Sequence, residues 1–211
     1  MKKNKNNSVL KMVQLTLLTA LVVVLQMTGT FIKIGPLPMS LVLVPIVIGG
    51  CLLGARAGAF LGFVFGLITM IAGITGTDAI SFILWQDNPA MFVILCLLKA
   101  TMAGLGSALI YKGLKKLFKG KKKNLQAIIA SVSAPIINTG IFVIGMLLFF
   151  FTKLNELPSM FPDVFGSFKN GVQLLFLGLA GFNFIGEFVV NLILSPAIVR
   201  IVDYVNNKLS K

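Results

Sequence analysis

The stretch "LCLLKATMAG", residues 95–104, places Lys99 near the middle of a long apolar run. A charged side chain at the centre of a membrane-spanning helix costs roughly 2.5–3.5 kcal/mol on insertion scales. Residues of this kind therefore usually face a cavity, a charged partner or a ligand. This position makes Lys99 a candidate binding residue.

Amide and carboxyl side chains occur within two later apolar segments. In "SAPIINTGIF" a proline precedes Asn138 and Thr139, and a proline inside a helix removes a backbone hydrogen bond and can open a polar widening. Asn183, Glu187 and Asn191 follow one another at intervals of four residues, which places them on one face of a helix. These side chains are candidates for the same site as Lys99.

The elements that must position these residues are apolar segments of spanning length. The chain of 211 residues is 57% hydrophobic and 12% charged, too apolar for a soluble domain and suited to a single membrane domain over residues 1–211. A spanning helix needs ~20 apolar residues, so we predict an all-α bundle of six transmembrane helices, with the second one short. The predicted spans are 9–28, 40–54, 55–74, 89–111, 125–152 and 172–202.

The basic residues predict how this bundle lies in the membrane. Of nineteen Lys and Arg residues, fifteen lie in the N-terminal tail, the turn around Arg56, the segment "YKGLKKLFKGKKKN" and the C-terminal tail. All of these fall on one side of the predicted bundle, against three on the other side. By the positive-inside rule, both termini are predicted to be cytoplasmic.

With this orientation the candidate residues lie at one depth. Lys99 is ~15 Å from the outer end of its helix at 1.5 Å per residue, and Asn138 and Asn183 reach a similar level on theirs. Glu187 lies one turn deeper. We predict a polar cavity there. In the alternative, Lys99 pairs with Glu187, and the asparagines only join helices, each contributing about 0.6 kcal/mol.

The residue types indicate what such a cavity would bind. A lysine beside amide groups suits a small molecule that carries a carboxylate and several hydroxyl or amide groups, because a hydrogen bond to a charged group contributes ~1.5–3 kcal/mol. The outward loops that contain "IKIGPLP" and "ILWQDNP" are predicted lids. Trp85 would close over the ligand and Gln86 would be a further contact, although an interfacial aromatic belt also explains Trp85.

Composition argues against several other functions. The chain has no histidine, and neither a metal ion nor any other cofactor is expected. Cys51 and Cys96 lie in apolar segments, as packing residues do. The net charge of +13 follows the loops and predicts topology, not a nucleic-acid partner. The basic, apolar N-terminus lacks a cleavage site like that of a signal peptide, so we interpret it as an uncleaved first helix.

The sequence is less consistent with two other functions. An intramembrane enzyme is disfavoured because the chain has no clustered carboxylate motif and no metal-ligand spacing. A self-sufficient secondary carrier is the other rival. Many such carriers are built from internal repeats, and none is detected in this sequence.

Three segments resemble a known family: "FIKIGPLPMSLVLVPIVIGGCLLGARAGAFLGFVFG", "PIINTGIFVIGMLLFF" and "NLILSPAIVRIV". Over nearly the whole chain the sequence resembles the S component, the substrate-binding subunit, of energy-coupling factor (ECF) vitamin transporters. The resemblance implies capture of a vitamin from outside, and delivery inward together with a transmembrane T component and two ATPase subunits. The chain itself has no G-x-x-x-x-G-K-[ST] phosphate loop.

The resemblance also implies a docking face on the first helix. Members of this family commonly present an A-x-x-x-A pair to the T component, and here Thr16 and Ala20 stand at that spacing. Small residues four apart allow close approach of two helices. Ordinary helix packing is the alternative for this pair.

Within the family, "PIINTGIF" resembles the pantothenate-type branch most closely. Riboflavin-type relatives carry a glutamate and a lysine in the third helix, and thiamine-type relatives use several tryptophans, tyrosines and a histidine. This chain lacks both patterns. Pantothenate agrees with Lys99 and the asparagines, while folate, biotin and nicotinate remain as anionic alternatives.

Overall fold

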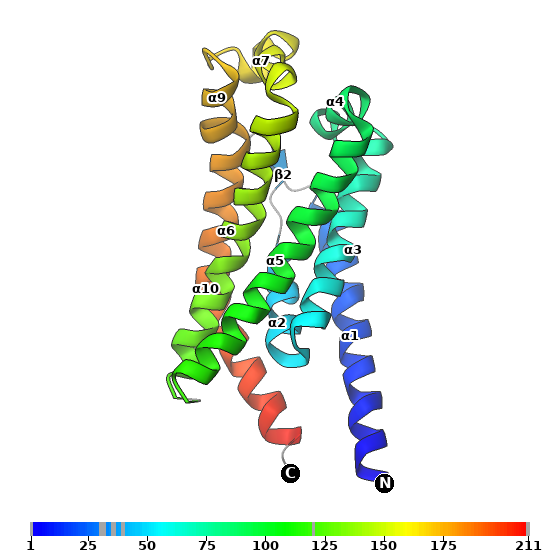
Figure 1. The fold of residues 1–211 in the computed structure, drawn as a ribbon, viewed down its shortest axis with the longest axis vertical. Coiled ribbons are helices and arrows are strands. Elements are labelled where there is room, and N and C mark those ends of the chain that lie inside the picture. Colours follow the sequence, from blue (N-terminus) through cyan, green and yellow to red (C-terminus); the bar gives the residue numbers. More distant parts are fainter. Residues whose placement is uncertain (1, 30–32, 35–36, 39–40, 120, 210–211) are drawn as a thin grey trace.

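A computed structural model describes residues 2–29, 33–34, 37–38, 41–119 and 121–209. The chain forms a bundle of long helices (Figure 1), which confirms the predicted all-helical membrane protein. The long helices are α1 (Lys2–Gly29), α3 (Ala55–Ile74), α5 (Pro89–Leu117), α6 (Lys123–Phe149) and α10 (Ala180–Leu209). The shorter elements are β1 (Lys33–Ile34), β2 (Leu37–Pro38), α2 (Leu43–Leu53), α4 (Ala79–Asp87), α7 (Phe151–Met160), α8 (Pro162–Phe165), α9 (Gly171–Gln173) and the π-helix η1 (Leu174–Leu179).

Five described helical stretches are long and apolar enough to cross a membrane, and they coincide with five of the six predicted spans. The second predicted span corresponds to α2, an apolar helix of 11 residues. At 1.5 Å per residue such a helix covers about 16 Å, roughly half of a hydrocarbon core of about 30 Å. The count of six crossings therefore stays a prediction.

A tight hairpin connects the second and third predicted spans. Gly54 joins α2 to α3 with a φ of 97°, a left-handed backbone conformation that glycine adopts without steric cost. Figure 1 shows both chain termini and the α5–α6 turn at one end of the bundle, with α4 and α7 at the opposite end. Which end faces the cytoplasm stays a prediction.

Two connecting segments at one end of the bundle contain helices, and one of them is the predicted lid around "ILWQDNP". The stretch between α3 and α5 forms α4, and the stretch after α6 forms α7 and α8, all too short to span. The α4 helix stops before α5 because Asn88 begins the new helix: its Oδ1 accepts a hydrogen bond from the Met91 amide at 3.2 Å, and Pro89 occupies the first helical turn. Short helices, and not irregular lids, therefore cover this end.

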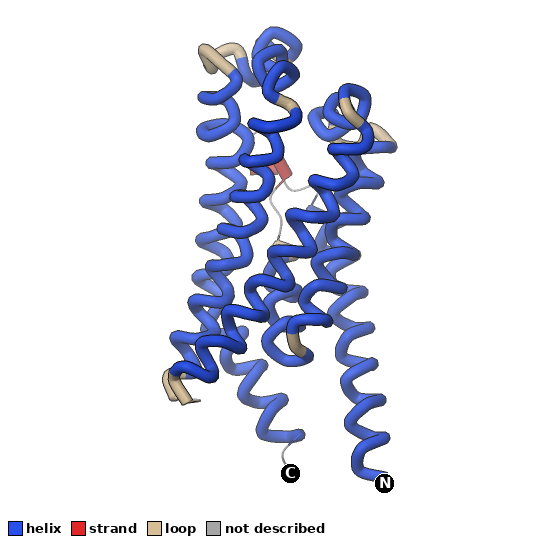
Figure 2. Tube along the Cα trace, in the orientation of Figure 1, coloured by secondary structure: helices blue, strands red, loops and turns tan. Residues whose placement is uncertain are grey.

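The loop after α1 contains a small antiparallel pair. Lys33 pairs with Pro38 and Ile34 with Leu37, and Figure 2 shows the strand segments among the helices. Residues 30–32, 35–36 and 39–40 of this loop lie outside the described residues. The lid predicted from "IKIGPLP" falls largely on that part of the chain.

The seam between α3 and α5 is packed backbone to backbone. Glycines of α3 face small residues of α5, and a Cβ atom added to Gly62 would clash with the backbone oxygen of Ala100. Gly58 and Gly104 stand in the same relation to each other. Small residues permit this close approach, as at many helix interfaces in membranes. The seam forms one wall of the bundle.

Candidate functional site

A cavity of about 120 Å³ lies between the helices. Its volume exceeds several-fold the roughly 10–15 Å³ that one water molecule requires. The wall joins the two apolar clusters of the bundle: Phe65 belongs to the cluster around α2, while Leu84 and Leu179 belong to the cluster beside α4 and α7. The polar lining residues are Gln26, Thr69, Asp78, Ser81, Lys99, Asn138, Thr139, Asn183 and Glu187.

The structure brings five of the seven predicted ligand contacts to this cavity. Three helices, α5, α6 and α10, contribute Lys99, Asn138, Thr139, Asn183 and Glu187. The similar depths predicted from the helical rise agree with the position of these residues in one cavity. Their contact with a ligand stays a proposal.

Lys99 lies at the cavity with its Nζ atom 4.9 Å from the centroid of the Phe142 ring. A cation over an aromatic face gains about 0.5–1 kcal/mol at exposed sites and more when desolvated. Among the described residues Lys99 forms no ion pair, and the predicted alternative of a Lys99–Glu187 pair is not what the structure shows. The positive charge is thus available to an anionic ligand.

Glu187 is only 1% exposed and is held by its own helix. Its Oε1 accepts a hydrogen bond from Asn183 Nδ2 at 3.3 Å, and its backbone oxygen accepts one from Asn191 Nδ2 at 2.8 Å. The predicted four-residue spacing accounts for both contacts. Asn191 itself is absent from the described lining of the cavity.

Four buried oxygens of the lining have no hydrogen-bond partner in the described part of the chain. They are Asn138 Oδ1, Thr139 Oγ1, Asn183 Oδ1 and Glu187 Oε2. A buried acceptor without a partner costs about 1–3 kcal/mol. The carbonyl and carboxylate oxygens can only accept, so the arrangement favours a ligand that donates several hydrogen bonds.

The backbone on both sides of these oxygens is irregular. Pro135 lies inside α6, one turn before Asn138, as the sequence predicted for a local widening. Opposite, η1 precedes α10, and the Ala180 amide donates to the Leu175 oxygen five residues back. π-Helical turns occur frequently at functional sites. Hydropathy does not reveal such a turn, and sequence reasoning missed it.

Sequence reasoning also missed four polar lining residues: Gln26, Thr69, Asp78 and Ser81. Gln26 Nε2 donates to Thr69 Oγ1 at 3.4 Å, which joins α1 to α3. Ser81 Oγ donates to Asp78 Oδ2. An acidic residue directly before a helix is a usual N-terminal signal. That signal explains Asp78 locally and so conceals its place at the cavity.

Trp85 and Gln86 do not line the cavity. The Trp85 ring packs edge-on against Phe92, with ring centroids 6.2 Å apart and planes at 71°. Gln86 is exposed. The aromatic rings that do line the cavity are those of Phe65 and Phe142. The roles predicted for Trp85 and Gln86 as ligand contacts have no support from this geometry and stay predictions.

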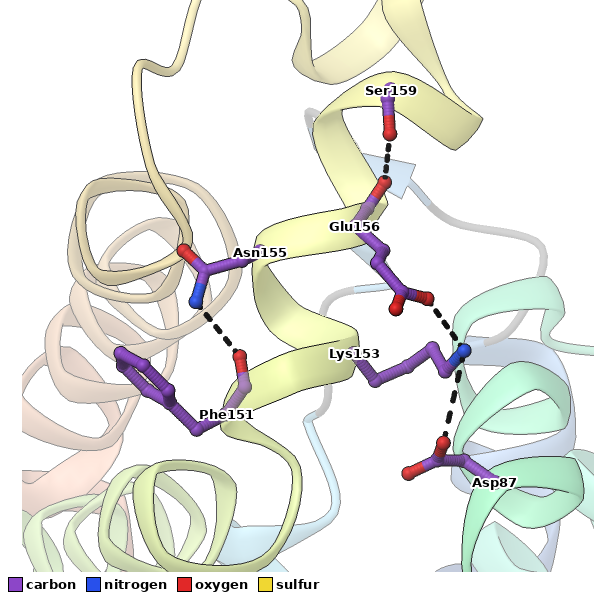
Figure 3. A network of polar contacts seen from close by, with 6 residues as sticks. All are labelled: Asp87, Phe151, Lys153, Asn155, Glu156 and Ser159. Carbon is purple, nitrogen blue, oxygen red and sulfur yellow. Dashed lines mark hydrogen bonds and ion pairs between the residues drawn. The ribbon is translucent and has the colours of Figure 1, made fainter.

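Above the cavity, the helices that follow α3 and α6 are joined by an ion-pair cluster (Figure 3). Lys153 Nζ of α7 lies 2.6 Å from Glu156 Oε2 and 3.7 Å from Asp87 Oδ1 of α4. The hydrogen bond from Lys153 to Glu156 is the main reason that the pKa of Lys153 is raised. The cluster links α7 to α4 at one end of the bundle.

The predicted docking pair lies on the surface of α1. Thr16 and Ala20 are both exposed, and Thr16 Oγ1 donates to the Met12 backbone oxygen at 3.0 Å. This bond satisfies the hydroxyl within the helix, so that the side chain adds little polarity to an apolar face. Leu17 and Leu21 beside the pair are exposed too. The surface is open to a helix of another chain.

The thiols and acids form no recognisable catalytic or metal centre in the described residues. Cys51 and Cys96 are not joined by a disulfide. No group of three or more histidine, cysteine or acidic side chains suitable for a metal ion occurs among the residues that the structure describes.

Comparison with known proteins gives two matches. Residues 10–199 match a family described as ECF transporter, substrate-specific component. A curated relative, the pantothenic acid transporter PanT of Lactococcus lactis subsp. cremoris (strain MG1363), is 36% identical over 94 residues. This match covers 43% of the present chain and 46% of the relative, so it spans less than half of that protein's length.

Proposed function

The chain belongs to the family of substrate-specific components of ECF transporters and is a multi-pass plasma membrane protein; from this premise we propose that it captures pantothenate. The vitamin binds from the outside and is delivered inward together with a T component and two ATPase subunits. The family is one of transporters and not of enzymes. The similarity to a pantothenic acid transporter supports this choice of vitamin.

One observation carries the choice of ligand: Lys99, which forms no ion pair with the described residues, lines the same cavity as buried oxygens that lack hydrogen-bond donors in the described chain. Pantothenate has a carboxylate at one end, an amide in the middle and hydroxyl groups at the other end. Its carboxylate complements Lys99. Its amide N–H and hydroxyl groups supply the donors that the oxygens lack in the described chain.

Each residue of the cavity is assigned to the part of pantothenate that its chemistry complements. Lys99 binds the carboxylate by a charge-assisted hydrogen bond, which contributes ~1.5–3 kcal/mol. Asn138, Thr139 and Asn183 accept hydrogen bonds from the amide and hydroxyl groups. Glu187 lies at the floor of the cavity, and its free Oε2 accepts from a ligand hydroxyl.

Delivery requires partner proteins. The chain has no phosphate loop of its own, so ATP hydrolysis takes place on other subunits. The exposed pair Thr16 and Ala20 on α1 is the proposed contact with the T component, because small residues let two helices approach closely. The surrounding apolar side chains of α1 suit a helix within the membrane.

The test is equilibrium binding of labelled pantothenate to the purified chain in detergent. Unlabelled folate, biotin, nicotinate and riboflavin serve as competitors. Saturable binding that only pantothenate displaces supports the proposal. Displacement by another vitamin keeps the capture role and rejects pantothenate.

Reconstitution in lipid vesicles tests the dependence on partners. We expect uptake of labelled pantothenate only when the T component and the ATPase subunits are included with ATP. Uptake by the chain alone would identify a self-sufficient carrier and contradict the proposed capture role.

A further inference from the structure

More acidic than basic side chains line the described part of the cavity, and this excess of negative charge bears on the net charge of the ligand. Of the described residues that line the cavity, Lys99 is the one cation, whereas Asp78 and Glu187 are both acids. Once a ligand carboxylate occupies Lys99, no described lining residue is left to neutralise a second negative charge. We propose that the cavity admits a monoanion and rejects ligands of higher negative charge, and that Asp78 is the residue that sets this limit. This inference rests on the proposed function.

Asp78 suits this role because its carboxyl group is fixed in place. Ser81 Oγ donates to Asp78 Oδ2, and both residues lie at the start of α4, which covers the cavity. The bond holds the carboxyl against the cavity wall. Asp78 is half-buried and lines the cavity, so its negative charge lies beside a ligand that occupies the cavity.

Glu187 suits the same role less well. Its Oε1 already accepts from Asn183, and its free Oε2 is the proposed acceptor for a ligand hydroxyl. Removal of its charge would change binding of every ligand that has this hydroxyl. Asp78 has no part in the proposed contacts, so its charge can be removed while the contacts remain.

Phosphorylation of pantothenate is the natural probe of this limit. A phosphate monoester on a ligand hydroxyl adds a charge of about −1.5 to −2 at neutral pH. Like charges repel, and the repulsion is stronger in a partly enclosed cavity than in bulk water. The site would thus bind the free vitamin and not its phosphate ester. A ligand phosphorylated inside the cell would then not compete for the site.

The first test uses the unaltered protein and separates charge from size. Unlabelled pantothenate, 4′-phosphopantothenate and a 4′-O-acetyl ester compete with labelled pantothenate. Kd for the phosphate ester is expected to be at least about 100-fold weaker than for pantothenate, and that for the uncharged ester about tenfold weaker at most. Equal rejection of both esters would show that size excludes them and would overturn the proposal.

The second test removes the charge by Asp78→Asn. Asparagine keeps the shape, can accept from Ser81 and is favoured directly before a helix, so the fold is expected to persist. The ratio of Kd for the phosphate ester to Kd for pantothenate should fall by about tenfold or more. Asp163→Asn is the control, because it removes an exposed charge of α8 outside the cavity and should leave the ratio unchanged.

An unchanged ratio in Asp78→Asn would overturn the proposal, as would loss of pantothenate binding, because Asp78 would then be a ligand contact. A second pair, nicotinate and the dianion pyridine-2,3-dicarboxylate, separates this proposal from the proposed vitamin. If nicotinate binds and pantothenate does not, the vitamin is wrong and the charge limit is measured on the second pair. Binding of neither monoanion would reject both proposals.

Discussion

Two helix seams of this protein differ in chemistry. Between α3 and α5, glycines bring the backbones together, so that the position of Gly62 has no room for even one added methyl group. On α6 and α10, which also contact each other, the buried residues include Asn138, Glu187 and Asn191, each with an oxygen that lacks a partner in the described chain. The first seam is closed by packing alone. The second keeps polar groups without a partner among the described residues, and two of these, Asn138 and Glu187, line the cavity where a ligand or water can reach them.

The two seams are expected to contribute to different properties, one to the stability of the fold and the other to ligand binding. Tight apolar packing makes a seam rigid, because displacement loses many contacts at once. Buried acceptors without donors lower stability and reserve binding energy for a ligand that supplies the donors. We therefore expect substitutions in the α3–α5 seam to act on folding, and substitutions around the cavity to act on affinity.

The largest loss of stability is expected for Gly62→Ala. The new methyl group would clash with backbone atoms of α5, which cannot move aside as a flexible side chain can, and overpacking of this kind costs about 1–3 kcal/mol of unfolding free energy. Thermal unfolding in detergent measures the loss. Gly140→Ala in α6 is the control, because apart from the adjacent backbone of its own helix no atom of the described residues lies within 4 Å of its added Cβ. A stable Gly62→Ala protein would contradict the description of a closed seam.

The second effect is expected for Lys99→Met. Loss of the charge should weaken pantothenate binding by about 10- to 150-fold, which corresponds to ~1.5–3 kcal/mol. Pantothenol, which has a hydroxyl group in place of the carboxylate, should lose much less. Competition binding measures both ligands. Equal losses for the two would show that Lys99 is structural.

The control for Lys99→Met is Lys112→Met. Lys112 lies on the same helix, is exposed and does not line the cavity. Its substitution should leave both affinities unchanged.

A smaller effect, opposite in sign for binding and stability, is expected for Glu187→Gln. Glutamine can still accept from Asn183 but offers an N–H group where Oε2 would accept from the ligand, so affinity for pantothenate should fall by about three- to tenfold. The unfolding temperature without ligand should stay equal or rise, because an unpaired buried acid is removed. Binding and unfolding are measured on the same preparation.

Glu156→Gln makes the same substitution on α7, outside the cavity, and should leave affinity unchanged. A large loss of stability in Glu187→Gln, with unaltered affinity, would mean that the α6–α10 seam is held together by Glu187 and not reserved for a ligand.

The smallest effect is expected where α7 meets α4 beyond the two seams. The pKa of Lys153 is raised in the folded protein, chiefly by its hydrogen bond to Glu156. The stabilisation is therefore complete below the ordinary lysine pKa of about 10.4 and is lost as pH rises through the raised value. Between about pH 9 and about pH 12, the unfolding temperature of the unaltered protein should fall more than that of Lys153→Met.

Lys169→Met serves as the control for Lys153→Met, because Lys169 is exposed and forms no ion pair in the described chain. Its unfolding temperature should follow that of the unaltered protein at each pH. Identical curves for all three proteins would show that the link between α7 and α4 contributes nothing.

The extent to which sequence predicted the site depends on the kind of residue. Lys99, Asn138 and Asn183 were found because a polar group within an apolar span is conspicuous, and because helical rise gives its depth. Asp78 and Gln26 were missed. Asp78 stands in a connecting segment and Gln26 near a helix end, where polar residues are ordinary. Trp85 was predicted to lie at the cavity because of its residue type, but in the structure its ring packs against Phe92.

The fold shows the same division. Hydropathy identified the five long spans, since burial in lipid requires about 20 apolar residues whatever their neighbours are. The short helices α4 and α7 escaped it, because they are too short for that requirement and depend on contacts with the ends of longer helices.

The sequence by itself therefore determined a membrane bundle, the polar residues within its spans and the family to which the chain belongs. The reason is that hydropathy, helical rise and motif similarity are properties of local sequence. Only the tertiary structure decided that Lys99 lies against Phe142 and that Asp78 joins the cavity. It also decided that, among the described residues, Lys99 has no ion pair and several buried oxygens have no hydrogen-bond partner. Partnerships between atoms depend on which helices pack together, and no local pattern encodes that choice.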